Sequence, residues 1–286
     1  MQRFQDRVAV VTGGASGIGR ASAERFAAAG MRIVLADVEE AALERAAREM
    51  AQAGACVLAV RTDVSKAAEV EALARRTLEH FGGVHLVFNN AGVYVAGASW
   101  EHSLADWEWV LGVNLWGVIH GVRTFVPILL EQKDEGHVVN TASMAGLTSN
   151  PFMSVYNVTK HGVVTLSESL HHELAMLGAK VKVSVLCPGF IRTRIADAAR
   201  NRPSDLRSDP PKPSSSPDTV AFDQALRAGV EAGFAPSQVA ERVFEAVRDE
   251  RFYVLLAQPE IRDSLLRRLE EIRLEENPRP PGAVVR

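Results

Sequence analysis

Short β-branched runs alternate along this chain with longer stretches rich in Ala, Glu and Arg, and this alternation constrains the possible folds more than any other feature. It is typical of repeated β-α-β units, which build a parallel sheet. Most of the runs are apolar throughout, as expected of strands that helices cover on both faces. We therefore predict an α/β fold with one doubly wound, seven-stranded parallel sheet in a three-layer α/β/α sandwich. The expected strands are Arg7–Thr12, Arg32–Ala36, Cys56–Arg61, Val84–Phe88, His137–Thr141, Lys180–Leu186 and Arg251–Leu256.

A chain of 286 residues can bury one core of this kind, so we expect a single domain spanning residues 1–286. Two segments depart from the alternation. Residues 191–235 contain Asp209-Pro210-Pro211 and Pro213–Pro217 and are too long for an ordinary connection. This pattern predicts either a lid over a substrate site or a flexible insertion. Residues 260–286 should form a charged helix and a frayed tail.

Polar residues mark several expected helix starts. Ser65 should cap the third helix, and Ser103 with Asp106 has the spacing of a capping box for the fourth. Ser237 lies near the start of a later helix.

The composition, 47% hydrophobic and 23% charged residues, is that of a globular protein. A net charge of −3 offers no attraction to nucleic acid or to an anionic membrane. No export signal is visible and no segment reaches the roughly 18 consecutive apolar residues of a membrane span, so we expect a cytoplasmic protein. Cys56 and Cys187 lie in apolar runs and should be core residues, not disulfide partners or metal ligands. The expected partner is a small molecule.

A glycine-rich loop, Thr12–Gly19, follows the first expected strand and precedes residues 20–29, which have strong helix propensity. Gly13, Gly17 and Gly19 would leave backbone N–H groups at the helix start open to a pyrophosphate, whose charge the helix dipole favours. Glycines also occur in ordinary turns. The strand before the loop and the helix after it favour the alternative, a dinucleotide site in a Rossmann-type fold.

Asp37 ends the second expected strand, about 20 residues after the glycine loop, where a ribose contact is expected. A carboxylate there accepts hydrogen bonds from the adenosine ribose and repels a 2′-phosphate, which favours NAD over NADP. The alternative is an Asp that simply begins a turn. Arg20 and Arg32 keep NADP open as the less favoured cofactor.

Tyr156 and Lys160 are four residues apart, so they share one face if 155–177 is helical, as its composition indicates. A phenol with a pKa near 10 is a poor base at neutral pH, and a nearby ammonium should stabilise the phenolate and lower that pKa. The same spacing occurs by chance on many exposed helices, so its meaning depends on the other motifs.

Taken together, these motifs closely resemble the classical short-chain dehydrogenase/reductase family, over about Val8 to Thr193. The order of the motifs along the chain is also that of the family. The resemblance implies that the cofactor contacts are Gly13, Ser16, Gly17, Ile18, Gly19, Asp37, Asp63, Val64, Asn90, Ala91, Gly92, Tyr156, Lys160, Pro188, Gly189, Ile191 and Thr193, and that the catalytic residues are Asn114, Ser143, Tyr156 and Lys160.

The family's chemistry implies a role for each catalytic residue. Tyr156 would take the alcohol proton during oxidation or return it during reduction, while a hydride moves to or from the nicotinamide. Ser143 would donate a hydrogen bond to the reacting oxygen. Lys160 would also bind the nicotinamide ribose, and Asn114 would hold a water that links Lys160 to solvent. The implied function is an NAD-dependent oxidoreductase that interconverts a secondary alcohol and a ketone on a hydrophobic small molecule.

Other interpretations remain open at this point. Ser143 could be a loop residue and Asn114 a helix residue bonded to backbone. A non-catalytic NAD(P)-binding regulatory protein would keep the same fold. An epimerase or dehydratase acting on a nucleotide-linked substrate is a further alternative, although the segment after Thr193 leaves little room for the larger substrate domain of those relatives.

The resemblance implies a homodimer or homotetramer, formed through the helices expected at 103–130 and 155–177. The Gly-rich end through which many relatives form a tetramer is missing after Leu256, so that assembly is in doubt. The tryptophans around the fourth helix should pack in a core or subunit contact, and His171-His172 lacks further metal ligands. Apolar residues near the motifs could line a substrate pocket, namely Val93, Tyr94, Leu147, Phe152 and Met153.

Overall fold

The computed structural model describes residues 1–207 and 216–279. Within them, seven strands form one sheet in the order β3-β2-β1-β4-β5-β6-β7, and every neighbouring pair is parallel. The predicted doubly wound, Rossmann-type sheet is therefore confirmed. Its strands are β1 Val8–Thr12, β2 Arg32–Asp37, β3 Val57–Arg61, β4 Leu86–Asn89, β5 Gly136–Thr141, β6 Val181–Pro188 and β7 Tyr253–Leu256.

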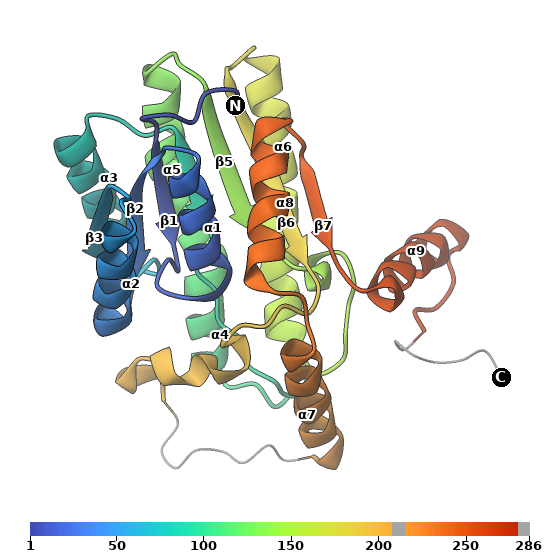
Figure 1. Ribbon diagram of the computed structural model, residues 1–286. Coiled ribbons are helices and arrows are strands. Elements are labelled where there is room, and N and C mark those ends of the chain that lie inside the picture. The colour runs from blue at the N-terminus through green and yellow to red at the C-terminus, as the bar shows by residue number, and fades with distance from the viewer. Residues whose placement is uncertain (208–215, 280–286) are drawn as a thin grey trace.

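Helices cover both faces of the sheet, and the alternation of side chains along each strand supplies two cores. In β1, Ala9 and Val11 point into one core, whereas Val8 and Val10 point into the other. The first core packs against α1 Gly17–Ala28, α2 Glu40–Gln52 and α8 Pro236–Arg248. The second packs against α3 Ala67–Phe81, α5 Gly117–Glu131 and α6 Ser154–Met176. Figure 1 shows α1 and α8 side by side on the near face of the sheet.

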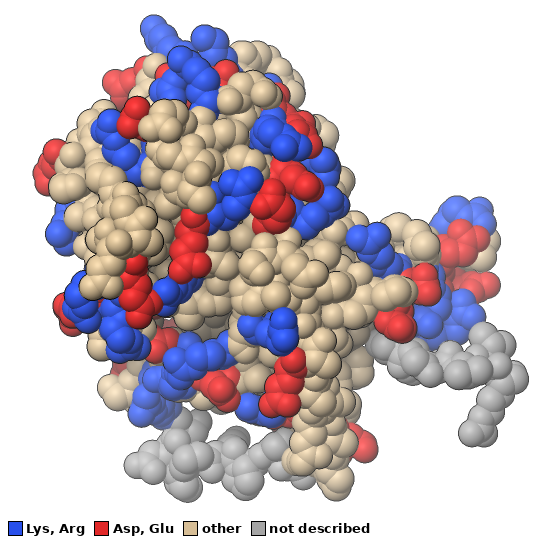
Figure 2. Space-filling model, viewed as in Figure 1, with Lys and Arg blue, Asp and Glu red and all other residues tan. Residues whose placement is uncertain are grey.

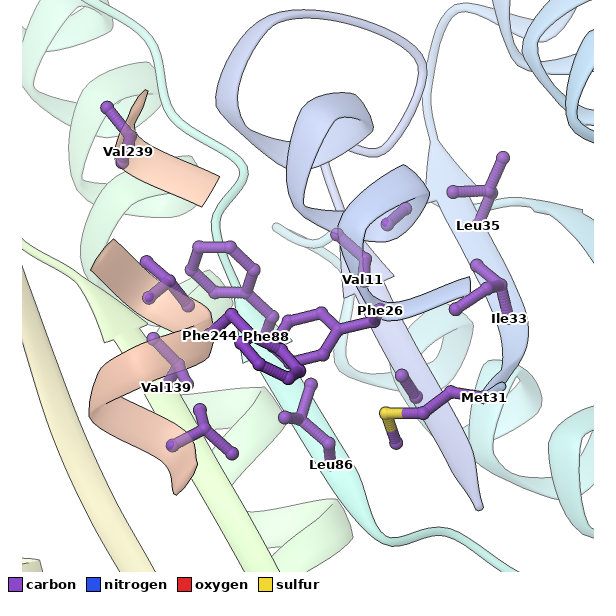
Figure 3. Packing of buried hydrophobic residues seen from close by; sticks show 14 of the residues in the cluster. Val11, Phe26, Met31, Ile33, Leu35, Leu86, Phe88, Val139, Val239 and Phe244 are labelled. Atoms are coloured by element: carbon purple, nitrogen blue, oxygen red, sulfur yellow. The ribbon is translucent and has the colours of Figure 1, made fainter. Parts of the chain in front are cut away.

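Aromatic rings join α1 to α8 in the first core (Figure 3). Phe26 is fully buried, and its ring centroid lies 5.9 Å from that of Phe244. Phe4 packs on Phe244 at 4.7 Å, which brings the N-terminal segment into the same cluster. Burial of this kind holds the helices at fixed positions over the sheet.

The strand order reverses beside β1, because β2 continues the sheet on one side and β4 on the other. At such a point the connections leave in opposite directions and open a crevice outside the carboxyl ends of the strands. The glycine loop follows β1 and Asp37 ends β2, so both lie at that edge. The fold therefore gathers the polar ends of the strands at one crevice.

The segment expected to be a lid contains more helix than its prolines suggest. Ile195–Asn201 and Ser204–Leu206 form short 3-10 turns near α4 Leu104–Leu111, and α7 spans Pro217–Glu231. Pro217 occupies the first turn of α7, where its missing N–H is harmless, and Ser216 caps that helix. The predicted motif Asp209-Pro210-Pro211 and residues 213–215 lie outside the described residues.

The expected C-terminal helix is present as α9, Pro259–Leu274. The helix extends away from the sheet in Figure 1. Figure 2 shows basic and acidic side chains interspersed over the visible face of the molecule. Pro280, Pro281 and Gly282 of the predicted tail lie outside the described residues.

Two sequence predictions about local structure were wrong. Cys56 is exposed, because β3 is an edge strand that begins only at Val57, whereas Cys187 is buried as expected. Ser65 does not cap α3; its hydroxyl donates to the Asp63 carboxylate at 2.7 Å, and Lys66 precedes the helix. The capping box of Ser103 and Asp106 is confirmed at the start of α4, and Ser237 lies in the first turn of α8.

Among the described residues, one helical run, Leu104–Glu131, is long and apolar enough to cross a membrane by length and composition. It comprises α4, a π-helical turn at Gly112–Trp116, and α5. In the structure Phe125 and Leu129 of this run pack in the second core of the sheet. The run therefore has the packing of a core helix.

We expect Leu86→Ala, in the middle of the sheet, to lower the free energy of unfolding by about 3 kcal/mol, because the cavity left in a close-packed core adds to the lost apolar burial. Leu266→Ala on the exposed side of α9 makes the same chemical change at 65% exposure and should alter stability by less than about 0.5 kcal/mol. Urea titration of both variants measures the difference. Equal losses would contradict the described core.

Candidate active site

A cavity of about 530 Å³ opens at the carboxyl ends of the strands, within the range of small-molecule sites. All but two of the residues expected in the site line it. The expected residues that line the cavity are Gly13, Ser16, Gly17, Ile18, Asp37, Asp63, Val64, Asn90, Ala91, Gly92, Ser143, Tyr156, Lys160, Pro188, Gly189, Ile191 and Thr193. The structure thus brings together side chains from both halves of the chain. The two exceptions are Gly19 and Asn114.

Backbone conformation and packing require glycine in the loop after β1. Gly13 and Gly17 have φ of +63° and +54°, which residues with a Cβ rarely adopt. A Cβ at Gly19 would overlap the carbonyl oxygen of Gly13, so this glycine lets the start of α1 pack against the loop. Ser16, Gly17 and Ile18 at the start of α1 line the cavity, and because the first N–H groups of a helix have no partner within it, this helix start suits a pyrophosphate.

The turn after β4 holds this loop in place. The hydroxyl of Thr12 accepts hydrogen bonds from the backbone N–H groups of Asn90 and Ala91, at 2.9 and 3.2 Å. The side-chain amide of Asn90 donates to the Thr12 carbonyl at 3.1 Å. Asn90 therefore shapes the cofactor loop as well as lining the cavity.

Asp37 turns its carboxylate towards the glycine loop. Its two oxygens accept hydrogen bonds from the N–H groups of Ala15 and Glu39, each at 3.0 Å. Burial raises the pKa of this carboxyl, and the two N–H donors oppose that rise. Asp37 therefore presents a hydrogen-bond acceptor at the cavity, beside the glycine loop.

The α6 helix begins just before the tyrosine and places Tyr156 and Lys160 one turn apart. The Lys160 ammonium lies 5.5 Å from the centroid of the Tyr156 ring and donates to the Thr141 carbonyl at 2.9 Å. Ser143, two residues beyond Thr141, donates to the Pro188 carbonyl at 3.4 Å and accepts from the N–H of Ala145 at 3.1 Å, and its hydroxyl lies close enough to the phenol to lower the pKa of Tyr156. Three polar groups therefore converge beside the glycine loop.

Burial dominates the protonation of this pair. It raises the pKa of Tyr156 to about 12, against the lowering effect of the Ser143 hydrogen bond. It lowers the pKa of Lys160 to about 8. Burial, which disfavours both charged forms, therefore outweighs the acidification of the phenol expected from the ammonium.

Asn114 lies in the π-helical turn between α4 and α5, fully buried. Its amide donates to the carbonyl of Val93 at 2.9 Å and accepts from the N–H of Val93 at 2.8 Å. It also donates to the Thr159 hydroxyl at 3.3 Å. The side chain thus holds the segment after β4 against α6, while its role in a proton relay stays a prediction. π-Helical turns often occur at functional sites.

Two ion pairs that sequence reasoning missed fasten the short 3-10 turns after β6 across the cavity. Arg200 pairs with Glu39 at 2.7 Å, and Arg202 pairs with Asp106 at 2.6 Å. The Arg202 guanidinium also lies 5.2 Å from the centroid of the Trp109 ring. The paired residues are 161 and 96 positions apart, so no local pattern in the sequence points to them.

The residues predicted to line an apolar pocket lie in several different places. Val93 lines the cavity, and Tyr94 and Met153 cluster with Tyr156. Phe152 lies 5.7 Å from Phe222 of α7, centroid to centroid. Leu147 packs instead in the cluster that includes part of α9.

The residues left without chemistry in the sequence analysis are also placed. Trp109 is buried and lines the cavity, whereas Trp100 and Trp116 are exposed. Among the described residues, no group of three His, Cys, Asp or Glu side chains is arranged to hold a metal, and His171 lies against Phe252.

The fold and the cavity define an α/β protein with a dinucleotide-type crevice, and comparison with known proteins narrows this class. Residues 7–204 match the family model described as short chain dehydrogenase. The chain therefore belongs to the short-chain dehydrogenase family of NAD(P)-dependent oxidoreductases.

Individual relatives agree with this assignment. The chain is 34% identical to a CLA biosynthesis dehydrogenase/reductase of Lactiplantibacillus plantarum over 89% of both chains. It is 33% identical to a C alpha-dehydrogenase of a Sphingobium species, over 95% of this chain and 87% of that one. A short chain dehydrogenase/reductase of Burkholderia phymatum, solved in complex with NAD, is 49% identical with a TM-score of 0.95, covering 99% of this chain and 100% of that one.

Proposed function

We propose that this protein is an NAD-dependent dehydrogenase that interconverts a secondary alcohol and a ketone on a small hydrophobic molecule. The observation that carries the proposal is the convergence of Ser143, Tyr156 and Lys160 on the cavity that the glycine loop also lines. The proposal is further supported by relatives named as dehydrogenases.

When bound, the nicotinamide supplies the hydride acceptor or donor, and the chain manages the proton. Tyr156 holds that proton on its hydroxyl at neutral pH, since its pKa is raised to about 12. The phenol is thus ready to protonate the oxygen of a ketone as that oxygen gains charge. Ser143 lines the same cavity beside the phenol and would donate a hydrogen bond to the same oxygen.

Lys160 acts beside the phenol and not on the substrate. Its bond to the Thr141 carbonyl fixes the ammonium near the Tyr156 ring, where a positive charge would stabilise the phenolate left after proton donation. In the opposite direction, oxidation, Tyr156 must first lose its proton.

Tyr156→Phe should reduce kcat by at least about 10³-fold, because it removes the proton donor and keeps the ring. Calorimetry should show an NADH Kd within about threefold of wild type. Tyr253→Phe, which removes an exposed phenol on β7, is the matched control and should retain activity. Near-normal turnover by Tyr156→Phe would overturn the proposed mechanism.

The rate of alcohol oxidation should rise with pH between pH 7 and 9, whereas ketone reduction should not rise. Below a pKa of about 12 each pH unit increases the phenolate fraction about tenfold, and only oxidation needs the phenolate. Profiles of kcat/KM in both directions measure this. An oxidation rate that falls over the range would contradict the assignment of Tyr156.

NAD should be preferred to NADP because the Asp37 carboxylate lies at the end of β2, next to the loop. We expect kcat/KM to be higher with NADH than with NADPH. Asp37→Asn should lower the ratio of these two values about tenfold, because the carboxylate no longer repels the 2′-phosphate of NADPH. The control is Asp134→Asn. Asp134 pairs with Arg7, which directly precedes β1, so it lies at the other end of that strand from the glycine loop. Equal kcat/KM values with NADH and NADPH in the wild-type enzyme would contradict this preference.

We further propose that the chain forms one domain in which residues 191–235 act as a lid. Support comes from the two ion pairs of Arg200 and Arg202, which join this segment to Glu39 in the cavity lining and to Asp106 in the first turn of α4. Arg202→Ala should speed NADH release about fivefold, as expected for loss of a half-buried pair worth about 1 kcal/mol. Stopped-flow fluorescence compares it with Arg48→Ala on α2, and equal release rates would exclude the lid role.

A homodimer or homotetramer through α4, α5 and α6 is also part of the proposal. Trp116, Val158 and Met176 expose apolar side chains on these helices, with Met176 at 88%. Such side chains favour burial against a second copy. Sedimentation velocity tests the assembly, which a monomer at micromolar concentration would rule out.

A further inference from the structure

Tyr94, in the segment after β4, has a buried hydroxyl without a partner. The residue is 6% exposed, and within the described residues its hydroxyl makes no hydrogen bond. A buried hydroxyl left unpaired is destabilising, and most such groups in native proteins are satisfied by protein, water or ligand. An unpaired one beside an active site therefore points to a partner that is not among the described residues, such as a bound ligand.

The position of Tyr94 links this hydroxyl to the reaction. Its ring meets the Tyr156 ring edge-on, with centroids 5.8 Å apart and an angle of 82° between the planes. Val230 of α7 belongs to the same side-chain cluster and also lines the cavity. Tyr94 lies behind this lining and is not part of it, so a molecule held by Tyr156 would reach Tyr94 only where α7 moves aside.

The surroundings of Tyr94 are almost entirely apolar. Ala145, Met153 and Leu226 pack around it, and Asp223 and Arg227 on α7 are the charged groups that face it. Burial raises the pKa of the Tyr94 phenol far above its usual value, with Asp223 adding to the rise. The hydroxyl therefore stays neutral and can both donate and accept a hydrogen bond.

We propose that Tyr94 binds a second oxygen of the substrate, so that the preferred substrate is an apolar molecule with two oxygen functions, such as a diol, hydroxyketone or diketone. The inference rests on the proposed function, because it takes Tyr156 to mark the reacting carbon. Since the phenol can donate and accept, it bonds the second oxygen as either carbonyl or hydroxyl. Leu226 and Val230 cover Tyr94 from α7, so this part of the lid must shift to admit the substrate.

Matched substrates test the proposal. Kinetics would compare cyclohexanone with cyclohexane-1,2-dione, cyclohexane-1,3-dione and cyclohexane-1,4-dione, in wild type and in Tyr94→Phe. We expect wild type to prefer at least one dione over cyclohexanone by about tenfold or more in kcat/KM, and Tyr94→Phe to reduce that preference about tenfold, as the loss of one buried hydrogen bond predicts. Tyr253→Phe is the matched control and should keep the preference.

Calorimetric binding of the same ketones to the NAD-bound enzyme keeps this test separate from the proposed reaction, because it needs no turnover. If no ketone is turned over, but diones bind more tightly than cyclohexanone and this difference is lost in Tyr94→Phe, the proposed reaction is overturned and the Tyr94 contact is supported. Turnover with a dione preference unchanged by Tyr94→Phe, or with no dione preference, would overturn the contact. A lower Tm in Tyr94→Phe with unchanged preference would assign the hydroxyl to a buried water and also overturn it.

Discussion

The pairing of β1 with β4 is the constraint on which the site depends. Because β2 extends the sheet on one side of β1 and β4 on the other, the connections diverge and leave a crevice at the carboxyl ends. Thr12, the last residue of β1, then holds the turn after β4 through its hydroxyl. Two segments that are distant in the sequence thus become a single edge of the cavity, and the next strand, β5, brings Ser143 to the same place.

Burial sets the chemistry at that edge. It makes the ammonium of Lys160 easier to deprotonate and the phenol of Tyr156 harder, so the two groups approach a state in which both are neutral. This differs from an exposed pair, in which the ammonium would remain charged at all physiological pH values. A charge that enters the cavity, whether on a cofactor or on a reacting oxygen, should therefore shift the pKa values of both groups strongly, because charges interact more strongly at a buried site than in water.

The fold was largely predictable because its signals are local. Apolar runs predict buried strands, and Tyr156 and Lys160 are one helical turn apart whatever surrounds them. The errors concern information that is not local. Cys56 has the pattern of a buried strand, yet its exposure depends on β3 being at the edge of the sheet. The pairing of Arg200 with Glu39 joins segments that meet only in the folded chain, and the raised pKa of Tyr156 follows from burial that a sequence does not display.

Asp106 has two partners whose functions differ. Its carboxylate completes the capping box with Ser103 at the start of α4 and also holds Arg202 of the 3-10 turns after β6. Burial alone would raise the pKa of Asp106, but the hydrogen bonds from Arg202 and Ser103 hold it below its usual value. Both contacts are therefore complete above the ordinary carboxyl range and are lost as the pH falls through that depressed pKa. Strong acid would thus weaken a helix start and break one of the two ion pairs that hold the 3-10 turns after β6, both through the protonation of one carboxylate.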